Sequence, residues 1–108
     1  MPELKSNPTL QDFQTYVAEL ENERGFTIQS LRDKCLLMGE EVGELFRAVR
    51  KSEGLAISND STFTEVEEEL ADIFIYLCAI ANRLDINLEE AFLAKEVKNK
   101  QRSWSQPE

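Results

Sequence analysis

Two pairs of acidic residues, each pair three positions apart, are the candidates for chemistry in this sequence. Glu41 and Glu44 form the first pair, and Glu69 and Asp72 form the second. Apolar residues recur with helical spacing around both pairs, so each pair shares one face of a predicted helix. At about 100° per residue, Glu41 and Glu69 each lie about 40° from the neighbouring apolar stripe, and their partners lie about 60° further round. Both helices therefore present their acids at the same angular offset.

These four carboxylates would meet at the edge of the core if the two helices pack side by side. Four ionised carboxylates in one cleft repel one another strongly unless cations neutralise them. Their oxygen atoms suit Mg²⁺, with Mn²⁺ as the alternative ion. Glu40 points toward the polar side of its helix and lies outside the predicted convergent set. The competing interpretation is a solvated acidic face without metal, because acidic pairs with this spacing are common on helix surfaces.

The amino-acid composition and the net charge limit which molecules this protein could bind. The chain has 108 residues, 21 acids against 12 bases and a formal net charge of −9. Such a surface repels nucleic acid polymers and anionic membranes, and a phosphorylated substrate would need a bound cation. The sequence contains no histidine, which excludes histidine acid–base catalysis and disfavours zinc and di-iron sites. No stretch has the pattern of a signal peptide or a membrane span, so we expect a cytoplasmic protein with reduced thiols. Cys35 and Cys78 lie inside predicted helices, and we expect both to be small core residues.

Helix is the expected structure throughout, in one domain over 1–108 with short flexible ends at 1–8 and 103–108. We predict an all-α, four-helix bundle-like protomer with caps at Thr9, Thr27, Thr64 and Asn87. The third predicted helix is apolar on more than one side, which favours a dimer or higher oligomer in so small a chain. The predicted helices are Leu10–Arg24, Ile28–Lys51, Glu65–Leu84 and Leu88–Gln101.

The acidic motif also carries a family resemblance. The segment GEEVGEL at 39–45, followed by ELAD at 69–72, resembles the E-E-x-x-E … E-x-x-D signature of MazG-like nucleotide pyrophosphohydrolases, within the all-α NTP pyrophosphatase superfamily. The likeness covers roughly residues 31–104. It implies a dimer or dimer of dimers and Mg²⁺-dependent hydrolysis of a nucleoside triphosphate, with non-canonical nucleotides among the candidates. The products would be the monophosphate and pyrophosphate, which is a house-cleaning activity.

Residue roles follow from this resemblance by position. It implies that Glu41, Glu44, Glu69 and Asp72 hold the metal and that Glu41 or Glu44 is the general base. Glu40 matches the first Glu of the signature and would orient a neighbour or assist the water. Phe26 stands where members often carry a Trp of the base pocket. Three further candidate substrate-binding residues, Lys95, Lys98 and Arg102, share one predicted helix face, with Asn99 beside Lys98. The segment 98–102 resembles the terminal K-N-x-x-R element of the family, although basic residues near a helix end can also simply complement the helix dipole. Asn82 is the last candidate, because asparagine is unfavourable inside a helix.

Two other functions compete with this one. A non-catalytic helical oligomerisation or regulatory module with an acidic face is the first alternative. A phosphatase-type hydrolase acting on another phosphate ester is the second. We expect Lys34, Arg47 and Arg50 to form surface ion pairs with nearby glutamates in any of these cases. The sequence does not distinguish a dimer from a tetramer. It also does not indicate which base or sugar the nucleotide substrate carries.

Overall fold

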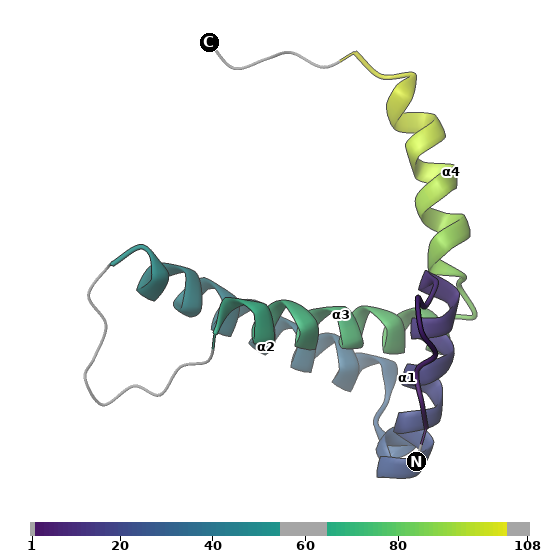
Figure 1. Ribbon diagram of the computed structural model, residues 1–108, viewed down its shortest axis with the longest axis horizontal. Coiled ribbons are helices and arrows are strands. Elements are labelled where there is room, and N and C mark those ends of the chain that lie inside the picture. The colour runs from purple at the N-terminus through teal and green to yellow at the C-terminus, as the bar shows by residue number, and fades with distance from the viewer. Residues whose placement is uncertain (1, 55–64, 104–108) are drawn as a thin grey trace.

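The computed structural model describes residues 2–54 and 65–103 and is helical, with no strand among those residues (Figure 1). The all-α prediction is confirmed, and the first predicted helix has the observed limits. The elements are α1 (Leu10–Arg24), a 3₁₀ turn η1 (Phe26–Ile28), α2 (Leu31–Ser52), α3 (Val66–Arg83) and α4 (Leu88–Lys100).

Capping residues explain where the helices begin. Thr9 and Asp12 form a capping box at α1, and Gly25, with φ of 75°, ends that helix. The predicted cap at Thr27 is wrong, because Ser30 and Asp33 form a capping box that starts α2 at Leu31 and leaves residues 26–28 as η1. The predicted cap at Asn87 is confirmed, since its Oδ1 accepts from the backbone N–H of Glu90 at 3.0 Å. Thr64 lies outside the described residues, as do Met1 and the tail from 104 to 108.

Helices α2 and α3 run antiparallel side by side, and α1 lies across the end where α2 starts and α3 finishes (Figure 1). The core lies where α1 crosses α3. Val17 and Leu20 pack there against Cys78 and Ala79, so the prediction of Cys78 as a core residue is confirmed. Cys35 is exposed, so the same prediction is wrong for Cys35 in the single chain.

A buried glutamine joins α1 to the junction of α3 and α4. Gln14 is 3% exposed, and its Nε2 donates to Asn82 Oδ1 at 3.1 Å and to the Ile86 carbonyl at 2.9 Å. Its Oε1 accepts from the Leu88 N–H at 2.7 Å. The side chain thus satisfies backbone groups that the break between two helices leaves open. It fixes the direction in which α4 leaves the rest of the chain.

The protomer is less compact than a typical domain of its length. Its Cα radius of gyration is 17.0 Å, against about 13 Å for a compact domain of this length. Helix α4 contacts α1 and extends away from the α2–α3 pair (Figure 1). Large apolar side chains stay exposed on three helices, among them Phe46 on α2, Leu70 and Leu77 on α3, and Phe92 on α4. Within the described segments, no helix is both long and apolar enough to span a bilayer.

Candidate metal centre and the adjoining pocket

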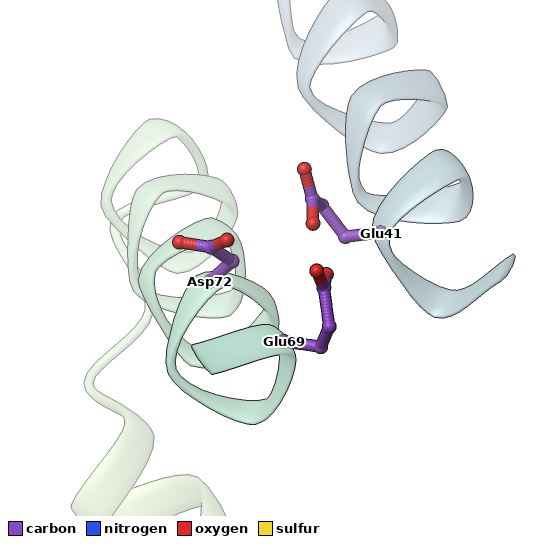
Figure 2. Close-up of side chains that lie close together, drawn as sticks. All are labelled: Glu41, Glu69 and Asp72. Atoms are coloured by element: carbon purple, nitrogen blue, oxygen red, sulfur yellow. The ribbon is translucent and has the colours of Figure 1, made fainter. Parts of the chain in front are cut away.

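Three of the four predicted metal ligands come together between α2 and α3. One carboxylate oxygen from each of Glu41, Glu69 and Asp72 lies within 4.8 Å of the others. Figure 2 shows Glu41 reaching from α2 toward Glu69, with Asp72 one turn further along α3. Glu69 is 3% exposed, Glu41 is half-buried and Asp72 is exposed. The cluster therefore extends from the buried helix contact to the surface.

The cluster carries more negative charge than its surroundings offset. A hydrogen bond between the Glu41 and Glu69 carboxyl groups is the main cause that raises the pKa of Glu41 to about 7. Burial and the charges of Glu69, Asp72 and Glu44 raise it further. Carboxyl groups titrate this high when the ionised forms repel one another at close range. A bound cation would remove that repulsion.

The donor set fits a hard divalent ion. An octahedral ion with bonds of about 2.1 Å holds its ligand oxygens at most about 4.2 Å apart. The carboxylates of Glu41, Glu69 and Asp72 are already close to that span, and rotation of an exposed side chain such as Asp72 would close the difference. Oxygen-only ligands match Mg²⁺ or Mn²⁺ and do not match a thiolate or imidazole metal site.

Glu44 and Glu40 lie around this cluster. Glu44 is exposed and is not one of the three convergent residues, but its charge contributes to the raised pKa of Glu41. Its role as a fourth ligand stays a prediction. Glu40 is also exposed. Burial, together with the charges of Glu41, Asp72 and Glu40, raises the pKa of the Tyr76 phenol.

A cavity of about 280 Å³ adjoins the metal cluster and shares residues with it. Glu41 and Asp72 line one part, and the end of α1, η1 and the start of α2 line the rest. Phe26, the candidate base-pocket residue, lies in its wall. Tyr76 lines the same cavity, although its aromatic ring alone predicts core packing. A small organic molecule could therefore contact both the carboxylates and the aromatic wall.

A buried ion triad supports this wall. Lys34 is 3% exposed, and its Nζ lies 2.7 Å from Glu21 Oε2, which also accepts from Arg83 Nη2 at 3.1 Å. Arg83 further donates to the carbonyl oxygens of Phe26 and Gln29 and so holds η1 in place. The predicted surface pairing of Lys34 is wrong, because its partner is a buried glutamate on another helix.

The basic residues of α4 are not brought to the cluster within one chain. Lys95 and Lys98 are exposed, and the Asn99 amide donates to Glu96 Oε2 at 2.8 Å. Arg102 and Asn99 line a separate shallow pocket near the end of α4. Asn82 lies ten residues after Asp72, about 15 Å along α3, and its amide is engaged with Gln14. That engagement explains an asparagine inside a helix without a ligand.

Residues 26–104 match the MazG nucleotide pyrophosphohydrolase domain. The chain belongs to this family. Two solved structures share its fold. The candidate pyrophosphatase YPJD of Bacillus subtilis has 30% sequence identity and a TM-score of 0.76, and the match covers 92% of this chain and 100% of that one. The iMazG protein of Vibrio DAT 722 has 31% identity and a TM-score of 0.68, covering 90% and 99%.

Curated relatives of this MazG domain include longer proteins. The dCTP pyrophosphatase 1 of Bos taurus is 33% identical over 102 residues, which are 90% of this chain and 60% of the relative. The enzyme of the same name from Rattus norvegicus is 34% identical over 100 residues, covering 88% and 59%. The chain thus spans about three fifths of the length of these relatives.

The sequence did not reveal the ion triad. Lys34 precedes Glu41 by seven residues, two helical turns, so both share one face of α2, as does Ala48. This spacing is the one available signal, and the stronger apolar stripe from Leu31 to Val49 concealed it. Glu21 and Arg83 gave no signal, because their contacts with Lys34 depend on how α1 and α3 pack.

Proposed function

We propose that this MazG domain is a Mg²⁺-dependent nucleoside triphosphate pyrophosphohydrolase, which releases a nucleoside monophosphate and pyrophosphate. The observation that carries the proposal is the convergence of Glu41, Glu69 and Asp72 beside a cavity large enough for a nucleoside. Membership of the family supports the reaction type. The names of the mammalian relatives make dCTP one candidate substrate, beside other canonical and non-canonical triphosphates.

The acidic residues of the site have the following roles in the proposed reaction. Glu41, Glu69 and Asp72 would hold the ion, with Glu44 as the predicted fourth ligand. When bound, Mg²⁺ supplies positive charge to the phosphate oxygens and makes a coordinated water more acidic. A carboxylate oxygen of Glu41 or Glu44 would accept the proton of the attacking water, with Glu40 in an assisting role. The new bond forms at the α-phosphorus, and the bond to the bridging oxygen breaks as pyrophosphate leaves.

We also propose that the working form is a homodimer or homotetramer. The protomer exposes large apolar side chains on α2, α3 and α4, which a second copy could cover. Lys95, Lys98 and Asn99 on α4, together with Arg102 just after it, would then bind phosphate groups at the site of another protomer, because they lie apart from the cluster of their own chain. Light scattering during size-exclusion chromatography tests the assembly: a monomer at micromolar concentration would contradict it.

The decisive experiment is product analysis with a panel of dNTPs and NTPs in ¹⁸O-labelled water. Attack at the α-phosphorus places the label in the monophosphate and leaves the pyrophosphate unlabelled. Release of orthophosphate alone would favour the phosphatase-type alternative and contradict our proposal. Glu41→Gln and Asp72→Asn should each lower kcat/KM by about 100-fold or more, because loss of a ligand should cost at least as much as the roughly 10- to 100-fold lost when a residue supporting a ligand is changed. Glu67→Gln, which neutralises an exposed acid in the first turn of α3, is the matched control.

A further inference from the structure

Lys34 is the buried cation of the cavity, and its surroundings leave it incompletely satisfied. An ammonium group has three N–H donors and no acceptor. Within the described part of the chain, Glu21 is the residue whose oxygen accepts from Lys34 Nζ. The other neighbours are two aromatic rings, with centroids 5.1 Å away for Phe26 and 5.7 Å away for Tyr76. A buried ammonium gains free energy from a further oxygen or nitrogen acceptor.

The position of Lys34 relative to the metal cluster indicates which part of a substrate could supply that acceptor. Lys34 and Glu41 lie on one face of α2, about 10.5 Å apart along the helix axis, and both line the same cavity. A nucleotide separates its α-phosphate from the carbonyl groups of its base by a comparable distance. Phosphate groups held at the carboxylate end would therefore place the base near Lys34.

The chemistry of the two cavity ends agrees with this orientation. The carboxylate end attracts a metal and, through it, phosphate. At the other end Lys34 and Arg83 share the single carboxylate of Glu21, so the triad has a formal excess of positive charge. The rings of Phe26 and Tyr76 offer flat apolar surfaces beside Lys34. Flat surfaces next to a hydrogen-bond donor suit a planar heterocycle with a carbonyl group.

We propose that Lys34 is a specificity-determining residue, whose ammonium group donates a hydrogen bond to a carbonyl oxygen of the nucleotide base between Phe26 and Tyr76. This inference rests on the proposed function and refines its substrate class. The favoured triphosphates carry cytosine, thymine, uracil or guanine, each of which has a ring carbonyl. Adenine has none and should be the poor substrate. Arg83 is a positioning residue here, because it acts through the carbonyl oxygens of Phe26 and Gln29 and does not touch the base.

The test compares dCTP, dTTP, dGTP and dATP with the wild-type protein and with Lys34→Met. Methionine keeps the length of the side chain and removes its charge and donors, while Glu21 keeps its contact with Arg83. A hydrogen bond from a charged donor changes kcat/KM by about 10- to 100-fold. We expect the variant to lose that much on the best carbonyl substrate, mainly through KM, and less than about 3-fold on dATP. Stabilisation by Mg²⁺ alone, measured by thermal unfolding, should stay as in the wild type.

The possible results distinguish a failure of this inference from a failure of the proposed pyrophosphohydrolase function. Equal losses on all four substrates would indicate a structural role for Lys34 and overturn the inference, while the pyrophosphohydrolase function would stand. A wild-type protein that cleaves dATP as well as it cleaves the best carbonyl substrate overturns the inference without any variant, so the test survives a variant that fails to fold. Absence of cleavage on these four substrates and on the wider panel of canonical and non-canonical triphosphates would refute the proposed function, and the inference with it.

Discussion

Replacing Glu69 with glutamine should stabilise the metal-free protein, although the position is buried. Glu69 is 3% exposed, and the amide of glutamine can still hydrogen-bond to Glu41. The substitution removes the nearest negative charge from Glu41, whose pKa has risen from 4.5 to about 7. At 1.36 kcal/mol per pH unit that rise corresponds to about 3 kcal/mol. Partial exposure and screening reduce the expected gain to about 1–2 kcal/mol at pH 8.

The same linkage sets the pH dependence of the wild type. Between pH 4.5 and about 7 the folded protein binds more protons at Glu41 than the unfolded chain does. Its contribution to stability is therefore complete below pH 4.5 and is lost as the pH rises through about 7. Glu69→Gln should flatten this part of the profile. Mg²⁺ should do the same for the wild type, because it neutralises the ionised carboxylates.

Urea denaturation in EDTA, repeated from pH 5 to pH 8, measures both effects. Glu67→Gln is the control, since Glu67 lies on the same turn of α3, is exposed and is not part of the cluster. The reasoning fails if Glu69→Gln is no more stable than Glu67→Gln at pH 8. It fails as well if Mg²⁺ stabilises Glu69→Gln as strongly as it stabilises the wild type.

Three further predictions concern metal, packing and assembly. Mg²⁺ at 100 times its Kd should raise the free energy of unfolding of the wild type by about 2.7 kcal/mol, which corresponds to a rise of roughly 10–20 °C in Tm. An unchanged Tm, or a rise in Tm that EDTA does not reverse, would favour the non-catalytic alternative. Gln14→Leu should cost about 2–4 kcal/mol in urea denaturation, because it leaves the Leu88 N–H and the Ile86 carbonyl without their partner; a cost below 1 kcal/mol would contradict this. Leu77→Lys, on the exposed face of α3, should convert the oligomer that we propose to a monomer in light scattering, whereas Arg32→Lys should not.

Local rules predicted the helices of this chain well. Thr9 and Asn87 cap their helices as expected, because capping depends on residues within one turn of the helix end. Thr27 failed for the same kind of reason, since the box formed by Ser30 and Asp33 competes for the same helix start and satisfies two backbone donors. Such competition is visible in the sequence once both candidates are compared.

The candidate site was predicted in part. Glu41, Glu69 and Asp72 meet because their angular positions follow from helix periodicity and because α2 and α3 pack as neighbours. Periodicity did not predict which side of α2 faces inward. The buried side contains Lys34 and Ala48, whereas Cys35 in the predicted apolar stripe is exposed. A buried lysine is stable there because Glu21 neutralises it, and that compensation involves another helix.

Helix α3 separates two requirements of the proposed enzyme. Glu69 and Asp72 face α2 and complete the cluster within one chain, whereas Leu70 and Leu77 project outward and stay exposed. Metal binding as we propose it would therefore need only contacts inside the protomer. The proposed phosphate binding by α4 would need a second copy, because Gln14 fixes the start of that helix away from its own cluster. A monomeric variant such as Leu77→Lys should consequently keep its stabilisation by Mg²⁺ and lose turnover, a combination that damage to the metal site could not produce.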